Sequence, residues 1–131
     1  MNWLKSLFIR AGAGVGDQGE SLAAAWLKAR GYRIMHRNLK VDDDEADLIA
    51  IDPDGRTVVV VEVKSRVDDG TPPEAWVNSR KQFHLVRLAS KLLKRREFAD
   101  RPFRFDVIAV VLRKDVKPEI RHIPGAFESR W

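Results

Sequence analysis

The sequence contains no cysteine among its 131 residues. Disulfide bonds and thiolate metal sites are therefore excluded, and the composition fits a protein of the reducing cytoplasm. The apolar runs are strand-sized, as at 107–112, and none approaches the roughly 20 residues that cross a bilayer. Residues 1–10 lack the apolar core and the small-residue cleavage site of a signal peptide. We therefore expect a cytoplasmic protein with no membrane partner.

What the sequence does contain is charge. Hydrophobic residues make up 44% and charged residues 33%, a balance typical of a soluble globular domain. The length suits one core, so we expect a single domain over 16–131, preceded at 1–15 by an arm or short helix. Repeats and low-complexity segments, which would indicate another architecture, are absent from the sequence.

The excess positive charge is unevenly distributed. The net charge is +5, with acids concentrated at 42–54 and bases at 80–104. A basic surface attracts a phosphate backbone, and an acidic cluster beside it can hold a divalent cation. The alternative is that 80–104 contains only a solvated basic helix face.

Periodicity predicts a mixed α/β domain. Residues 17–30 have helical spacing, with Asp17 as a cap, Glu20 three residues later and Gly31 after the end. A second helix is expected from 78 or 79 to about 97. The expected strands span 32–38, 46–51, 57–65 and 103–112, with a short fifth at 119–123. Asp52-Pro53-Asp54-Gly55 is a turn sequence, so the second and third strands should form an antiparallel hairpin.

The candidate site lies on this hairpin. Glu62 and Lys64 share one face of a valine-rich strand, because side chains alternate across a strand. Asp47 falls on the neighbouring strand. A register that pairs Asp47 with Val60 or with Glu62 places it on the same face, whereas a slip of one residue would separate the three side chains.

Two carboxylates within about 5 Å repel by about 3 kcal/mol at an effective dielectric constant near 20. A divalent cation offsets this repulsion, and hard oxygen ligands favour Mg²⁺ or Mn²⁺. We therefore expect Asp47, Glu62 and the Val63 carbonyl to hold a cation that activates water and polarises a phosphate, with Lys64 orienting the water or stabilising charge. The alternative is a structural cluster in which Lys64 alone balances the acids. Glu20 has two expected roles, which do not exclude each other: half of a capping box with Asp17, and a further carboxylate at the metal.

Several motifs, in order, resemble those of the YraN-like family of small bacterial proteins. They are Gly16-x-x-Gly19-Glu20-x-x-Ala23, Gly31-Tyr32, Arg37-Asn38, Glu45-x-Asp47-Leu48-Ile49-Ala50, Val61-Glu62-Val63-Lys64-Ser65-Arg66, Lys81 and Arg104-Phe105-Asp106-Val107. This family is similar to archaeal Holliday-junction resolvases and other PD-(D/E)xK nucleases. The resemblance covers roughly residues 12–127 and implies the restriction-endonuclease-like fold, with helices flanking a mixed central sheet. It also implies a catalytic set made of Asp47, Glu62, Lys64 and Glu20.

Two positions depart from the family pattern. Asp44 stands where the family usually has glycine, and Ala46 where it usually has isoleucine or leucine. Neither departure removes an expected ligand, but Asp44 alters the entry to the strand and adds negative charge. We expect contacts with nucleic acid from five residues around the site: Arg66, Arg80, Lys81, Gln82 and Arg87. Trp76 is expected to pack in the protein rather than stack on a nucleobase. Asp106 is expected to be structural and paired with a basic side chain.

Three functions follow from these expectations. The first is a Mg²⁺-dependent endonuclease acting on DNA, for which branched or single-stranded DNA are candidate substrates. The second is a nucleic-acid-binding module that has the nuclease fold but no useful turnover. The third is an interaction protein whose acids form an ordinary ion-pair network. Enzymes that cut both strands often use two sites, so the sequence leaves a homodimer open as the assembly.

Overall fold

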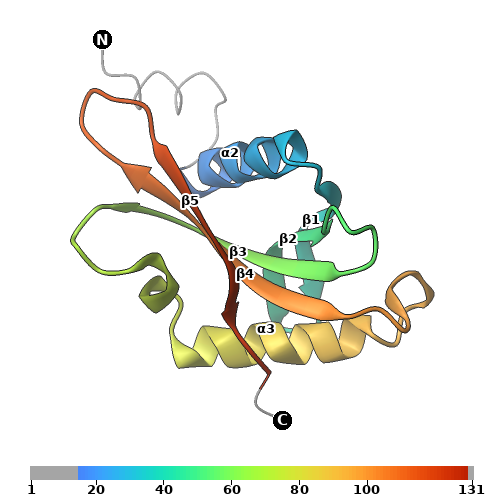
Figure 1. Ribbon diagram of the computed structural model, residues 1–131. Coiled ribbons are helices and arrows are strands. Elements are labelled where there is room, and N and C mark those ends of the chain that lie inside the picture. Colours follow the sequence, from blue (N-terminus) through green and yellow to red (C-terminus); the bar gives the residue numbers. More distant parts are fainter. Residues whose placement is uncertain (1–14, 130–131) are drawn as a thin grey trace.

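The computed structural model describes residues 15–129. A five-stranded sheet in the order β1-β2-β3-β4-β5 has helix α2 (Val15–Ala29) on one face and helix α3 (Ser79–Leu92) on the other (Figure 1). The strands are β1 (Arg33–Val41), β2 (Asp44–Ile51), β3 (Val58–Val67), β4 (Phe103–Leu112) and β5 (Glu119–Phe127). This arrangement confirms the expected mixed α/β class with a helix on each side of a central sheet.

The sheet is antiparallel except at its centre. Strands β1, β2 and β3 form a meander, and β4 and β5 are also antiparallel. Strands β3 and β4 are parallel, so the chain must cross over between them. The crossover runs through the 3₁₀ turn η1 (Pro73–Trp76), helix α3 and the 3₁₀ turn η2 (Arg96–Phe98). The crossover therefore brings α3 across the face of the hairpin that carries the candidate site.

The valine run of β3 is buried on both faces. Val58 and Val60 pack on the α3 side with residues such as Leu85 and Leu88. Val59 and Val61 pack on the α2 side with residues such as Leu27. A central strand covered by helices on both faces needs a continuous apolar sequence, and this explains why the run does not alternate with polar residues.

The turn expected between β2 and β3 is confirmed. The Asp52 N–H donates to the Thr57 carbonyl at 2.9 Å, and the Gly55 N–H donates to the Asp52 carbonyl at 2.9 Å. Gly55 has a φ of 76°, a conformation that glycine adopts at little cost. The hairpin register, on which the candidate site depends, is therefore set by a well-bonded local turn.

Every expected strand except 103–112 extends past an expected end in the structure, and the extensions of β1 with β2 and of β5 have identifiable causes. The β1–β2 hairpin extends to a tight turn at Asp42 and Asp43, where Asp42 has a φ of 55°. The run of aspartates at 42–44 did not indicate a turn in the sequence, although aspartate tolerates the left-handed conformation. Strand β5 continues to Phe127 through Pro124 and Gly125, residues that usually end a strand, because the ladder with β4 is irregular between Phe105 and Val107.

The helix bounds also differ from the expected ones. Helix α2 includes Val15, so Asp17 lies inside it and the expected cap at Asp17 is wrong. Helix α3 ends at Leu92 rather than near residue 97, because the chain turns through η2 to bury Phe98. The expected arm at 1–15 lies outside the described residues apart from Val15. Within residues 15–129, the helices are too short or too polar to cross a bilayer.

Candidate functional site

Asp47 and Glu62 lie side by side where the β2–β3 pairing ends. Leu48 pairs with Val61, and one further step in the same register sets Asp47 opposite Glu62. Asp47 Oδ2 accepts a hydrogen bond of 2.7 Å from the Val63 N–H. One of the two registers expected from the turn is therefore the one adopted, and it places both carboxylates and Lys64 on the face that α3 covers.

Glu62 is a buried carboxyl group. Its residue is only 3% exposed, and burial is the main cause that raises its pKa to about 8, followed by the hydrogen bonding and negative charge of Asp47. The positive charges of Lys81 and Lys64 act in the opposite direction. Perturbation of this size by desolvation and a neighbouring acid is typical of functional sites, although structural networks also produce it.

Lys81 makes the closest cationic contact with Glu62. Its Nζ lies 3.5 Å from Glu62 Oε2 and donates a 3.0 Å hydrogen bond to the Glu45 carbonyl. The helix start fixes this position, because Asn78 caps α3 by accepting from the Lys81 N–H at 2.8 Å. Lys64, half-buried on β3, reaches Glu62 only through its longer-range charge. Sequence reasoning gave Lys81 a phosphate contact and missed its ion pair, because nothing in the local sequence sets α3 against β3.

The donor set fits a hard divalent cation. Glu62 Oε2 is buried and accepts no hydrogen bond from the described part of the chain, and Asp47 Oδ2 is already occupied by the Val63 N–H. Mg²⁺ is commonly held by one or two carboxylates together with substrate phosphates and water. Residues 15–129 contain no group of three or more acidic or histidine side chains arranged around one point. The protein would therefore supply Asp47 and Glu62, with the rest of the shell coming from the Val63 carbonyl, water or substrate.

Glu20 approaches the same end of β3 from the other face. The preceding residue, Gly19, is buried so close to β3 that a Cβ at this position would overlap the Ser65 hydroxyl. Ser65 and Val63 point towards α2, whereas Glu62 and Lys64 point towards α3. Glu20 is half-buried in the turn of α2 that makes this approach. Its assignment to the metal site stays a prediction.

The side chains expected to contact nucleic acid differ in whether another residue of the protein already holds them. Arg87 forms a two-pronged pair with buried Asp44, at 2.8 Å and 2.6 Å, so its charge is largely committed. Asp44, which stands where the family usually has glycine, thus has a structural role that the sequence did not predict. Arg66 lies over the Trp76 ring at 5.4 Å, and Gln82 donates to the Val77 carbonyl at 2.9 Å.

Arg80 differs from Arg87 because it is exposed and has no ion pair within the described part of the chain. Trp76 is buried against Ala109 and Val111, which confirms the packing role expected for it. The contacts expected from these bases to nucleic acid stay predictions.

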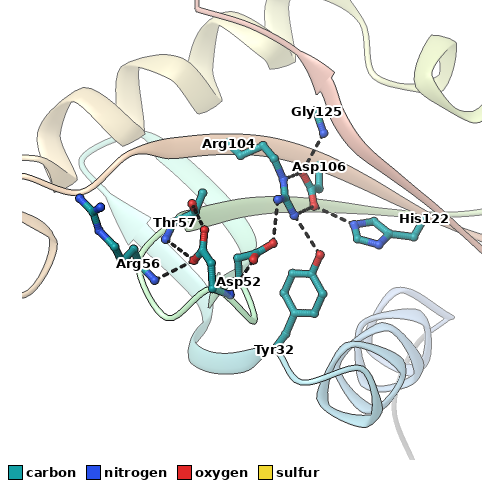
Figure 2. A network of polar contacts seen from close by, with 9 residues as sticks. Tyr32, Asp52, Arg56, Thr57, Arg104, Asp106, His122 and Gly125 are labelled. Carbon is teal, nitrogen blue, oxygen red and sulfur yellow. Dashed lines mark hydrogen bonds and ion pairs between the residues drawn. The ribbon is translucent and has the colours of Figure 1, made fainter.

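Another buried acid, Asp106, is the centre of a polar network on the α2 side of the sheet (Figure 2). It accepts from Arg104 Nε at 2.8 Å and Nη2 at 2.9 Å, from the Gly125 N–H at 3.0 Å, and lies 2.7 Å from His122 Nε2. Burial alone would raise the pKa of Asp106, but the bonds from His122, Arg104 and Gly125 outweigh it and lower the pKa.

The network also reaches the hairpin turn. Arg104 Nη1 donates to Asp52 at 2.7 Å, and Nη2 donates to the Tyr32 hydroxyl at 2.9 Å (Figure 2). The structural role expected for Asp106, paired with a base, is confirmed. The network joins β4, β5, the β2–β3 turn and the residues that follow α2, and it is separate from the face that carries Glu62.

Comparison with known proteins identifies the family to which the chain belongs. Residues 19–110 match the uncharacterised protein family UPF0102. The chain is 43% identical over 118 residues to a UPF0102 protein of Geotalea uraniireducens (strain Rf4), covering 89% of this chain and 91% of that one. It is 45% identical over 117 residues to one from Symbiobacterium thermophilum, covering 88% and 97%. The match to the family and these relatives show that the chain belongs to the UPF0102 family, the YraN-like proteins that its motifs resemble.

Proposed function

We propose that this protein has the restriction-endonuclease-like fold and is a Mg²⁺-dependent phosphodiesterase that hydrolyses nucleic acid, DNA in the first instance. The observation that carries the proposal is the pairing of Asp47 with buried Glu62 on adjacent strands, on the same face as Lys64. An acid pair of this kind is costly in the absence of a cation. A site that retains it next to a lysine has the chemical groups that metal-assisted phosphate hydrolysis requires.

Topology supports the fold assignment. The acids occupy one antiparallel hairpin, β2–β3, and the chain then crosses through α3 to the parallel strand β4. The first turn of helix α3 thereby brings the Lys81 ammonium to 3.5 Å from the Glu62 carboxylate. The motifs shared with PD-(D/E)xK nucleases fall on the same two strands. The positions of Asp47, Glu62 and Lys64 on these strands support the proposal.

The protein groups have distinct tasks in the proposed reaction. Mg²⁺ would supply charge to polarise the phosphate and acidify water. Asp47 is oriented by its bond to the Val63 N–H and would offer the cation a carboxylate oxygen. Glu62 supplies a second oxygen ligand from a dry environment, where electrostatic interactions are strong. Lys64 is half-buried on the same face and would stabilise the negative charge that grows on the phosphate.

A cleavage assay tests the proposal. Labelled single-stranded, duplex, flap and four-way-junction DNA and an RNA strand would each be incubated with Mg²⁺, Mn²⁺ or EDTA. We expect metal-dependent cleavage that Asp47→Asn, Glu62→Gln and Lys64→Met each abolish. Asp42→Asn is the matched control, because it removes an exposed carboxylate that pairs with Lys91. Cleavage that survives EDTA, or that persists in Asp47→Asn and Lys64→Met, would exclude this site as its source.

The second candidate function is binding without turnover. It is favoured by the contact between Lys81 and Glu62, which supplies a counter-charge without a metal. In that case no substrate would be cut under any metal condition, and salt-sensitive binding to nucleic acid would remain. The same set of substrates, examined by fluorescence anisotropy, separates the two functions.

A further inference from the structure

Lys81 occupies an unusual position for a phosphate-binding lysine. Its ammonium points into the acid site, 3.5 Å from Glu62 Oε2 and 3.0 Å from the Glu45 carbonyl. The side chain of Glu62 is 4% exposed, whereas that of Lys81 is 31% exposed. Lys81 therefore reaches the buried carboxylate from a position that is also open to solvent.

Of the two acids of the site, Glu62 forms an ion pair, and among the described residues its partner is Lys81. The Asp47 carboxylate is oriented by a backbone N–H, so it has a partner that carries no full charge. Lys64 shares the face of Glu62 but, within residues 15–129, forms no ion pair with it. In the absence of a divalent cation, Lys81 is thus the group that balances the buried charge.

A divalent cation held by Glu62 and the Lys81 ammonium would compete for the same oxygen. Like charges about 4 Å apart repel by several kcal/mol at an effective dielectric constant near 20, so both cannot stay in place. The backbone of Lys81 is fixed by the Asn78 cap and by the burial of Leu85 in the next turn. The long side chain of Lys81 can move without the helix, and its compact ammonium is not tied to one partner geometry as the planar guanidinium of arginine is.

We propose that Lys81 is a transferable counter-ion: it neutralises Glu62 in the metal-free site and passes to a phosphate of the nucleic acid when a divalent cation takes its place. This inference rests on the proposed function, because it requires a cation at Asp47 and Glu62. It assigns Lys81 two successive partners, and it couples metal binding to substrate binding. Metal-free protein would then hold nucleic acid through one charge fewer than metal-loaded protein.

The first test measures Mg²⁺ affinity by amide NMR. The Val63 N–H donates to Asp47, so its resonance reports directly on a cation at this carboxylate. Titrations would be run above the pKa of Glu62, about 8, so that protons do not compete. We expect Lys81→Gln to bind Mg²⁺ roughly tenfold more tightly than the native chain, between the effects of exposed and buried ion pairs. Lys81→Arg, which keeps the charge, should not gain affinity.

Lys91→Gln is the matched control for Lys81→Gln. It removes the same charge from the same helix, at a lysine of similar exposure (32%) that pairs with Asp42 and Asp44 instead. We expect its Mg²⁺ affinity to equal that of the native protein. If Lys81→Gln proves too unstable to titrate, Lys81→Met replaces it and keeps the aliphatic stem.

The second test measures how salt weakens DNA binding. Both proteins would carry Lys64→Met to keep the labelled duplex intact, and one would also carry Lys81→Gln. With Mg²⁺, the protein that retains Lys81 should show a steeper dependence of log affinity on log salt, by about 0.9, the value of one phosphate contact. These measurements would also be made above the pKa of Glu62, about 8, so that its carboxylate is ionised. Without Mg²⁺ the two slopes should then coincide, because Glu62 holds Lys81.

The outcomes distinguish the inference from the function on which it rests. If Mg²⁺ leaves the Val63 resonance of the native protein unmoved, the proposed metal site fails and the counter-ion role fails with it. If Mg²⁺ binds equally well to the native protein and Lys81→Gln, or the two salt slopes agree in Mg²⁺, the counter-ion role alone is overturned.

Discussion

Arg104 and Asp106, two residues apart on β4, are joined by two parallel hydrogen bonds of 2.8 Å and 2.9 Å. Asp106 is fully buried and accepts further bonds from His122 and the Gly125 backbone. Removing its charge leaves the Arg104 guanidinium without its main partner. We expect Asp106→Asn to lower the free energy of unfolding by about 3–5 kcal/mol, as for other broken buried pairs. Urea denaturation checks this through a lower midpoint with an unchanged m-value.

The matched control for that substitution is Asp42→Asn. Asp42 also pairs with a base, Lys91 at 2.7 Å, but its side chain is 73% exposed. Surface pairs contribute little, so a much smaller loss is expected. Equal losses in the two variants would contradict a central role for the buried network.

The network also sets a pH dependence. The pKa of Asp106 is lowered from its ordinary value of 3.8, because the bonds from His122, Arg104 and Gly125 outweigh the cost of burial. A lowered carboxyl pKa contributes stability that is present above the unfolded value and disappears as the pH falls through the folded value. The stability difference between the native chain and Asp106→Asn should therefore shrink below about pH 4. Urea midpoints across the acid range would reveal a constant difference if this linkage were absent.

Glu62 should produce the opposite pH dependence. Burial and Asp47 raise its pKa from 4.5 to about 8, so the folded protein retains a proton that the unfolded chain has lost. The resulting stability is complete below 4.5 and is lost as the pH rises towards 8. In metal-free buffer, the free energy of unfolding of Glu62→Gln should rise relative to that of the native protein over this pH interval, by on the order of 3 kcal/mol.

Thermal unfolding with and without Mg²⁺ completes that measurement. Mg²⁺ should raise the melting temperature of the native protein at high pH, because a ligand of the folded state stabilises it. It should have little effect on Glu62→Gln. A native melting temperature that does not respond to Mg²⁺ would argue against the metal site.

The close approach of α2 to β3 predicts a coupled pair. A Cβ on Gly19 would overlap the Ser65 hydroxyl, whereas the Ser65 Cβ would lie at an ordinary 3.6 Å. Gly19→Ala should therefore destabilise the native chain or leave it unimproved. In a Ser65→Ala background the same change should stabilise by up to about 1 kcal/mol, the helix preference for alanine. A double-mutant cycle measures this coupling, and additive effects would show that the contact is unimportant.

Arg80 and Arg87 should differ as nucleic-acid contacts. Arg87 is held by Asp44, whereas Arg80 is exposed and forms no ion pair within residues 15–129. Arg80→Gln should reduce the salt dependence of DNA binding by about one phosphate contact and leave stability unchanged. Arg87→Gln should mainly reduce stability, since it removes both hydrogen bonds of Arg87 to buried Asp44 and leaves that carboxylate only Lys91, 3.8 Å away. The reverse pattern, seen by anisotropy and urea denaturation, would mean that Arg87 leaves Asp44 to bind DNA.

The local sequence predicted the parts of the fold that local chemistry determines. Asp52-Pro53-Asp54-Gly55 indicated the β2–β3 turn, and that turn brings Asp47 level with Glu62. The sequence could not select between the two registers that put these acids on one face. It also missed the turn at Asp42, because a run of aspartates looks the same in a loop and in a tight hairpin.

The parts that were missed depend on contacts distant in sequence. The pair of Arg87 with Asp44 joins residues 43 positions apart, and the bond of Arg104 to Tyr32 joins residues 72 apart. Neither follows from periodicity, because each requires the crossover through α3 to be placed first. The contact of Lys81 with Glu62 has the same origin, and so the basic segment was read as a free surface although several of its members are paired.

The parallel pairing of β3 with β4 has a consequence for the order of folding. Asp47 and Glu62 belong to a hairpin closed by a short turn, whereas β4 can join β3 only after the whole crossover has formed. Short loops close at lower entropic cost, so we expect the hairpin to form first and to bring the acids together before α3 can deliver Lys81. Conservative truncations at Ile49 should then slow refolding more than those at Ile108, and φ-values from stopped-flow refolding would show the reverse if β4 docked early. During folding, the carboxylates of Asp47 and Glu62 would thus repel each other before the Lys81 ammonium is in place to balance their charge.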